Sequence, residues 1–224
     1  MAAMLTKNGL IDMILDWEPL VEEFKLNIHG MIQIGSHVGQ EYSVLKDHGC
    51  SNFLMFEPVP HTYDKLLKTI ESVGSDNIDV ITENFALGKE DGETVLYLDD
   101  REQASTTALR PVNHLTLYPN IKFDTTITVP LRSLDSYCTE SDLDLSKFNM
   151  INIDVGGYEL EVFRGATQAL SAVDYIMTEV NRTEMYEGCC NVNELDEYLG
   201  EYGFSREKTG WPNAHWGDAF YVKS

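Results

Sequence analysis

One apolar run that ends in a glycine turn constrains the fold of this chain more than any other feature. Residues 31–34 read Met-Ile-Gln-Ile, and Gly35 and Gly39 follow with three residues between them. A second apolar run, residues 53–56, ends directly in Glu57. A strand that stops in a glycine turn, next to a strand that stops in a carboxylate, is typical of nucleoside-binding sites. There the glycines let the backbone approach the ligand, and the acid accepts hydrogen bonds from ribose hydroxyls.

The balance of charged residues narrows the classes of partner. The 224 residues suffice for one domain with a sizeable core, and 16 basic against 37 acidic residues give a net charge of −21. We therefore expect no nucleic-acid partner and no binding to an anionic membrane surface, because both need basic patches. Membrane insertion is not expected either, because no apolar run is long enough. No signal peptide or membrane-spanning run is visible. No zinc pattern links Cys50, Cys138, Cys189 and Cys190, and the adjacent Cys189 and Cys190 are a pair that rarely forms a structural disulfide. Reduced thiols and a cytoplasmic location are therefore expected.

The order of apolar runs and amphipathic stretches predicts strands and helices in alternation. We expect strands at residues 31–35, 53–56, 78–86, 94–98, 126–131, 149–155 and 175–180, helices at 38–47, 61–73, 158–170 and 192–202, and a closing antiparallel pair at 204–207 and 219–222. Residues 88–92 predict a hairpin turn with 94–98 as its return strand, and residues 99–124 predict a long irregular loop. This pattern indicates an α/β fold with a mostly parallel sheet covered by helices on both faces.

The N-terminal segment is predicted to be helical. Residues 10–25 carry apolar side chains at helical spacing, with Pro19 between them. Because proline interrupts a helix, we expect a broken helix or two short ones. Residues 1–27 are thus predicted to pack on the body as a helical segment, and residues 28–224 to form the rest of a single domain.

The residues that directly follow the parallel strands are the candidates for ligand binding. The glycine spacing is G-x-x-x-G, without the third glycine that a dinucleotide pyrophosphate requires. S-Adenosylmethionine carries no phosphate, so it is the favoured cofactor. Asn84, after the third strand, is a candidate neighbour of the adenine. A plain strand–helix turn, with Glu57 as an ordinary surface acid, is the structural alternative.

Asp154 directly follows an apolar strand and precedes two glycines, which predicts a position in the binding site. Capping of the next helix is the structural alternative, and both can hold. Glu179 and Asn181 end the neighbouring strand, so with Asp154 they could give three oxygen ligands to a divalent cation such as Mg²⁺. Residues two apart point the same way only while the strand persists, which argues against this metal site.

Two histidines are candidates for the general base, because histidine is the commonest choice for a hydroxyl substrate. His215 lies beside Trp211 and Trp216 just before the last strand, and His114 lies in the long loop. We rank His215 first and His114 second, although a single histidine is more often structural. The aromatic group around His215 suits stacking on a sugar ring, and a packed aromatic edge is the alternative.

Taken in order, several of these segments resemble the FkbM-type methyltransferases. The segments are residues 32–41, 56–58, 86–92, 131–135, 151–159 and 217–222. The resemblance implies a Rossmann-like class I methyltransferase fold, with a mostly parallel seven-stranded sheet and an antiparallel C-terminal strand. It also implies S-adenosylmethionine as methyl donor and O-methylation of a hydroxyl, often on a sugar or a polyketide.

The resemblance also assigns roles by position. It implies that residues of the glycine turn and the first helix surround the methionine part of the cofactor: Gly35, Ser36, His37, Gly39 and Glu41. Glu57 would bind the ribose, and Asn84 and Ala86 would flank the adenosine. Ser105 would lie near the cofactor in a serine-rich loop. Asp154 belongs beside the cofactor too, and is our first choice at the acceptor oxygen. The chain has Gln33 where the family usually has Asp, and Gly-Gly-Tyr-Glu at 156–159 where it usually has Glu-Gly-Ala-Glu. The identity of the acceptor substrate therefore cannot be inferred from a relative.

The favoured hypothesis is an O-methyltransferase acting on a sugar or glycan hydroxyl. Its main contribution would be alignment, with an acid, a histidine or a metal-bound route removing the proton. A nicotinamide oxidoreductase is a second hypothesis, disfavoured by the missing glycine. A non-catalytic glycan-binding or scaffold module and a methyltransferase of a non-sugar small molecule stay open. Fusion to, or association with, a glycosyltransferase stays open as well.

Overall fold

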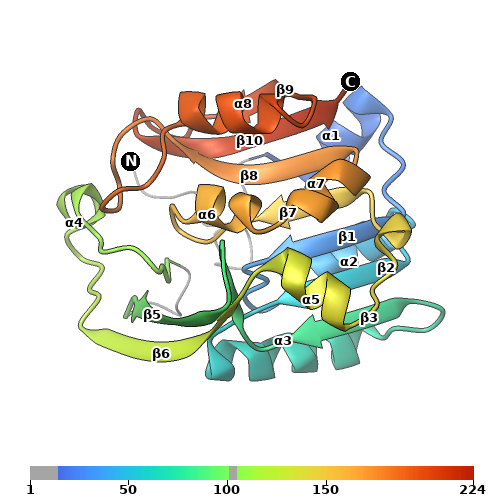
Figure 1. Ribbon diagram of the computed structural model, residues 1–224, viewed down its shortest axis with the longest axis horizontal. Helices are drawn as coiled ribbons and strands as arrows, with labels where there is room; N and C mark the ends of the chain where they lie inside the picture. Colours follow the sequence, from blue (N-terminus) through green and yellow to red (C-terminus); the bar gives the residue numbers. More distant parts are fainter. Residues whose placement is uncertain (1–14, 101–104) are drawn as a thin grey trace.

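The computed structural model describes residues 15–100 and 105–224, which form a seven-stranded sheet and a smaller three-stranded sheet (Figure 1). The strands are β1 (Gly30–Ile34), β2 (Asn52–Phe56), β3 (Asp79–Glu83), β4 (Ala86–Leu87), β5 (Gly92–Leu98), β6 (Thr125–Arg132), β7 (Met150–Ile153), β8 (Tyr175–Asn181), β9 (Phe204–Gly210) and β10 (Trp216–Lys223). The helices are α1 (Trp17–Phe24), α2 (Gln40–Asp47), α3 (Pro60–Val73), α4 (Asn113–Leu117), α5 (Leu134–Glu140), the 3-10 helix η1 (Leu145–Lys147), α6 (Glu159–Arg164), α7 (Thr167–Ala172) and α8 (Val192–Gly200).

The larger sheet has the order β3-β2-β1-β7-β8-β10-β9. Its first five strands are parallel, β10 runs antiparallel to β8, and β9 runs antiparallel to β10. The predicted fold class and the closing antiparallel pair are confirmed. The parallel strands all end at one edge of the sheet, on the side where β5, β6 and α4 lie in Figure 1.

Apolar clusters cover both faces of this sheet. On one face, α5, α6, α7 and α8 pack against β-strand residues such as Ile151. On the other, which we call the α2 face, α1, α2 and α3 pack against Met31, Met150 and Met177. Because side chains two apart along a strand share a face, Gln33 and Asn152 also belong to the α2 face. Figure 1 shows α5, α6 and α7 in front of the sheet and α2 behind it.

The predicted break at Pro19 is wrong. Helix α1 begins at Trp17, so Pro19 lies in the first turn, where a backbone N–H has no intrahelical acceptor to lose. Trp17 and Leu20 are buried against the α2 face. Residues 10–14 of the predicted helix lie outside the described residues.

The single helix predicted at residues 158–170 is instead two helices, α6 and α7. A Cβ on Gly165, between them, would lie 2.1 Å from the carbonyl oxygen of Gly88, so the chain passes too close there to continue a helix with any other residue. The carboxylate of Asp135 accepts hydrogen bonds from Thr167 N and Gln168 N, which begins α7 afresh.

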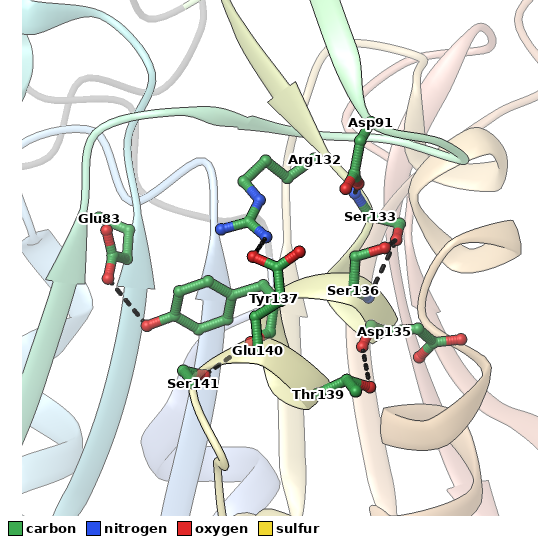
Figure 2. Close-up of polar contacts among 10 residues, drawn as sticks. All are labelled: Glu83, Asp91, Arg132, Ser133, Asp135, Ser136, Tyr137, Thr139, Glu140 and Ser141. Atoms are coloured by element: carbon green, nitrogen blue, oxygen red, sulfur yellow. Dashed lines mark hydrogen bonds and ion pairs between the residues drawn. The ribbon is translucent and has the colours of Figure 1, made fainter.

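The strand predicted at 78–86 is present but shorter, and the hairpin predicted after it is wrong. Strand β3 ends at Glu83, and β4 belongs to the smaller sheet. In that sheet β6 lies between β4 and β5, so β5 pairs with β6 and not with the strand before the turn. The carboxylate of Asp91 accepts from Ser133 N (Figure 2), which fastens the turn to the end of β6.

Three further findings complete the fold. The loop predicted at 99–124 contains the short helix α4. All four cysteines are free thiols, as expected. Across the described parts of the chain, every helix is too short or too polar to cross a membrane.

Candidate active site

The turn after β1 brings the ends of three strands together. The backbone N–H groups of Gly35 and Ser36 both donate to Phe56 O at the end of β2. Gly35 has a φ of +78°, and a Cβ there would lie 2.0 Å from the carbonyl oxygen of Asp154, just past β7. Only glycine tolerates both conditions. The glycine predicted from the sequence therefore keeps the ends of β1, β2 and β7 in contact.

Glu57 is held at the end of β2 by the turn that it faces. Its Oε2 accepts from His37 N at 2.8 Å, and its Oε1 accepts from Val59 N at 2.9 Å. The side chain is 5% exposed. Burial raises the pKa of Glu57 to about 7, although both hydrogen bonds favour the charged form. Each carboxylate oxygen keeps a lone pair for another donor, so Glu57 can accept hydroxyls of a ligand.

The other residues assigned to the cofactor lie around this turn or in the loop beyond it. Asn84 Nδ2 donates to Glu57 O at 2.8 Å, so Asn84 adjoins Glu57. Glu41 accepts from Gln33 Nε2 at 2.6 Å and joins α2 to β1. Ala86 is buried in β4, and Ser105 N donates to Asp99 Oδ2 at 2.6 Å. Their contacts with a cofactor, and those of Gly39, stay predictions.

Three carboxylates gather past the ends of β7 and β8: Asp154, Glu159 and Glu179, which we call the acidic group. Glu159 is buried, and its Oε1 accepts from Val155 N and Gly157 N at 3.1 Å each. Glu159 therefore shapes the turn that carries Asp154. Asp154 itself is exposed to solvent although protein atoms crowd around it, so water and a ligand can both reach its carboxylate.

Desolvation and mutual repulsion raise the pKa values of the acidic group. Burial, and then the charge of Asp154, raise the pKa of Glu159 to about 7. Burial, and then repulsion by Asp154 and Glu159, raise the pKa of Glu179 well above its usual value. Desolvation also raises the pKa of Asp154, while a hydrogen bond from Gly156 N and the nearby His37 lower it. Such a group favours a cationic or hydrogen-bond-donating ligand.

Three buried amides on the α2 face have side-chain oxygens without a hydrogen-bond partner: Gln33, Asn152 and Asn181. Gln33 pairs with Asn152 across β1 and β7, and Asn152 pairs with Met177, two residues before Glu179. Asn181 Nδ2 donates to Glu179 Oε1 at 3.3 Å. We call Gln33, Asn152, Glu179 and Asn181 the strand-end row. A buried acceptor without a donor lowers stability, so this row indicates donors on a ligand.

His114 lies one aromatic ring away from the acidic group. Its ring stacks on Tyr186 at 5.6 Å, and a Cβ on Gly157 would lie 2.8 Å from the Tyr186 ring. Burial lowers the pKa of His114 to about 4. A base with so low a pKa takes up a proton weakly at neutral pH, which argues against His114 as the general base.

His215 lies just before β10, in the loop that also carries Trp211. Its Nδ1 lies 3.2 Å from Thr183 Oγ1. The guanidinium of Arg182 lies over the Trp211 ring, 3.6 Å from its centroid. His215 and Trp211 thus contact protein groups, as expected if this loop is a packed aromatic edge. Their roles in catalysis or sugar binding stay predictions.

The residues predicted to bind a metal are brought together only in part. Asp154 and Glu179 interact electrostatically, but the amide nitrogen of Asn181 donates to Glu179. Within residues 15–100 and 105–224, no group of three or more His, Cys, Asp or Glu side chains could hold a metal ion. Binding of a metal ion by Asp154, Glu179 and Asn181 therefore stays a prediction.

Residues 33–206 match the model of the methyltransferase FkbM domain, a span that includes the glycine turn, Glu57 and the acidic group. The chain belongs to the FkbM methyltransferase family. The resemblance predicted from the sequence is thereby confirmed.

Two curated proteins are similar to this FkbM methyltransferase domain over part of their length. The chain is 38% identical over 79 residues to the 2-O-methyltransferase NoeI of Sinorhizobium fredii, a match that covers 35% of this chain and 32% of NoeI. It is 24% identical over 148 residues to the hexuronic acid methyltransferase AglP of Haloferax volcanii, covering 66% of this chain and 54% of AglP. The chain thus spans less than two thirds of each relative.

Solved structures agree on the fold. A methyltransferase FkbM from Methylobacillus flagellatus KT gives a TM-score of 0.57 at 14% identity, over 87% of this chain and 43% of that one. Magnesium protoporphyrin IX methyltransferase from Synechocystis PCC 6803, with bound S-adenosylmethionine, gives 0.52 at 11% identity, over 92% and 76%. Identities this low show the fold alone, and the predicted Rossmann-like methyltransferase fold is confirmed.

Sequence reasoning did not assign four residues of this FkbM methyltransferase site: Gln33, Asn152, Glu159 and Tyr186. Gln33 and Asn152 do carry a signal, because each is a polar residue inside an apolar strand. Glu159 is harder to recognise, because an acid in the first turn of a helix is favoured by the dipole whatever its function. Tyr186 carries no signal, since its partners His114 and Gly157 come from other segments.

Proposed function

We propose that this chain is an S-adenosylmethionine-dependent O-methyltransferase acting on a sugar or glycan hydroxyl. The observation that carries the proposal is the buried carboxylate of Glu57, which backbone donors of the glycine turn hold at the end of β2. Family membership supports the reaction class. The names of the two relatives, a 2-O-methyltransferase and a hexuronic acid methyltransferase, support a saccharide acceptor.

The residues at the strand ends fit S-adenosylmethionine. The turn from Gly35 to Gly39 serves a ligand without phosphate, and Glu57 has lone pairs for a ribose diol. The unpaired amide oxygens of Gln33 and Asn152 suit the ammonium of this ligand. The pyrophosphate of a nicotinamide dinucleotide would instead bring negative charge toward three carboxylates, which disfavours the oxidoreductase hypothesis.

The chain's own residues would then divide the work. S-Adenosylmethionine, when bound, supplies a methyl group made electrophilic by the sulfonium charge. Glu57 binds the nucleoside hydroxyls, and Glu159 holds the turn that carries Asp154. Asp154 is accessible, and its raised pKa makes it a better proton acceptor for the sugar hydroxyl at neutral pH. Alignment of that hydroxyl supplies much of the remaining acceleration.

Titration calorimetry tests cofactor binding. We expect S-adenosylmethionine to bind and NADH not to bind. Glu57→Gln should weaken binding of S-adenosylmethionine about tenfold or more, because an amide offers one acceptor oxygen in place of two. Glu71→Gln, an exposed acid on α3, is the matched control and should leave affinity unchanged. Equal affinity of the Glu57 variant and the wild type would refute the assignment of Glu57.

A methyl-transfer assay separates the enzyme from its alternatives. Transfer from S-adenosylmethionine to simple sugars supports the proposal, whereas cofactor binding without any transfer supports a non-catalytic module. Transfer that stops in EDTA and returns with Mg²⁺ would support the predicted metal; we expect the Asp154 route to persist in EDTA. Association with a glycosyltransferase stays a prediction, to be tested by co-purification.

A further inference from the structure

We infer that the acceptor site selects a sugar without a carboxylate, either neutral or amino-bearing, and rejects hexuronic acids. This inference rests on the proposed function and specifies its substrate class. It is carried by two independent features at the ends of β7 and β8: the three carboxyl groups gathered in the acidic group, and the unpaired side-chain oxygen of Asn181.

His37 lies near Asp154, but Glu159 and Glu179 have no ion-pair partner among the described residues. Among the described residues, every ion pair involves other carboxylates than Asp154, Glu159 and Glu179. The basic residue that follows β8, Arg182, lies over the Trp211 ring. A sugar carboxylate bound here would therefore meet three carboxyl groups, two of them largely buried, and like charges repel one another more strongly there than in bulk water.

The amide of Asn181 points to the same class of ligand on different grounds. Asn181 is 2% exposed, its nitrogen donates to Glu179, and its oxygen has no partner. This oxygen can only accept a hydrogen bond. A sugar hydroxyl or ammonium can donate to it, whereas an ionised carboxylate has no proton to donate and would leave it unpaired. Rejection by an unpaired buried group is an effective source of specificity.

The side chains near this site reinforce the same preference. Across β8 and β10, Glu179 pairs in register with Asp218, a further buried acid. The site thus combines acceptors and negative charge. A relative named for hexuronic acid, matched at 24% identity, is not expected to share its acceptor with this chain.

The test is a ratio of kcat/KM values for paired acceptors. Methyl glycosides of glucose, galactose and mannose are compared with the corresponding hexosamines and hexuronic acids, with S-adenosylmethionine as donor. We expect wild-type protein to prefer a neutral or amino sugar over its uronic acid by about a hundredfold or more. Glu179→Gln should narrow this preference about tenfold, and Asn181→Asp should widen it, because the first removes an ionisable carboxyl group and the second adds one.

The control is Glu197→Gln, which removes the same charge from an exposed position on α8 and should leave the ratio unchanged. Because both acceptors are measured on one preparation, partial loss of folded protein cancels from the ratio. A uronic acid accepted as well as its neutral partner overturns the inference while the proposed function stands. Cofactor binding without methylation of any neutral or amino sugar overturns it too. Absence of S-adenosylmethionine binding is the separate outcome that defeats the proposed function, and the inference with it.

Discussion

The polar residues around α5 are mostly only partly buried and are joined by hydrogen bonds, whereas the buried amides of the strand-end row leave oxygens unpaired. Figure 2 shows Tyr137 donating to Glu83 at 2.8 Å, and Ser133 accepting from Ser136 N at 3.1 Å as the N-cap of α5. Asp135, on the same helix, accepts from both backbone and side-chain donors at the start of α7. These bonds join α5 to β3 and α7, and they serve the fold.

The strand-end row has the opposite character. Gln33, Asn152 and Asn181 each leave an oxygen unpaired, and Glu179 is crowded by other acids. Unpaired buried groups lower stability and are uncommon in native proteins. Such groups persist where a ligand supplies the missing donors. Buried polar groups that the fold leaves unpaired therefore tend to mark functional sites. The contrast implies that substitutions near α5 change stability, whereas substitutions at the strand ends change binding and turnover.

The largest expected effect is at Asp154. Asp154→Ala should lower kcat on the order of a hundredfold or more, because it removes the proposed proton acceptor. Affinity for S-adenosylmethionine should change far less, as calorimetry can check. Asp174→Ala, an exposed acid before β8, is the control for loss of charge. Turnover that survives in the Asp154 variant would show that another group accepts the proton.

Next in size is a loss of stability at α5. Asp135→Ala should lower the free energy of unfolding by about 2–3 kcal/mol, because three donors lose a charged acceptor at the start of α7. Asp135→Asn, which keeps one acceptor oxygen, should lose less. Urea denaturation measures both. If instead these variants unfold like the wild type while S-adenosylmethionine binding falls, the assignment of this region to stability is wrong.

A smaller effect is the pH dependence of cofactor binding. Below pH 7 the carboxyl of Glu57, with a pKa of about 7, is mostly protonated and loses acceptor capacity. Affinity for S-adenosylmethionine should therefore rise about tenfold between pH 6 and pH 8, as expected when a ligand binds only the deprotonated form. Calorimetry across this range measures it. Glu57→Gln should bind weakly with a flat profile; a similar slope in that variant would assign the titration to another group.

The smallest expected effect is a gain in stability. Glu179→Gln should raise the free energy of unfolding by about 1 kcal/mol at neutral pH, because it removes a repelled and partly desolvated charge while keeping the side chain's shape. Thermal unfolding of this variant and of Glu197→Gln gives the comparison. A destabilised Glu179 variant would place Glu179 with the α5 residues, as a group that serves the fold.

Much of this arrangement is predictable from local patterns. Alternating apolar runs and amphipathic stretches indicate a parallel sheet, and Gly35 and Glu57 are recognisable because a turn and a strand end have local signatures. The break between α6 and α7 was not predictable, because it depends on the approach of Gly88 to Gly165 across the fold. The pairing of β5 with β6 was missed for a similar reason, since a hairpin turn does not specify which strand lies next to it.

The sequence by itself determined the order of strands and helices, the glycine turn, the acids at the strand ends and membership in the FkbM methyltransferase family. Those features are local, so the residues that produce them are close together in the chain. Only the tertiary structure decided that Gln33, Asn152 and Asn181 share one face with Glu179, and that Tyr186 links His114 to the acidic group. Pairing, burial and charge repulsion depend on neighbours from distant segments, and folding alone brings these together.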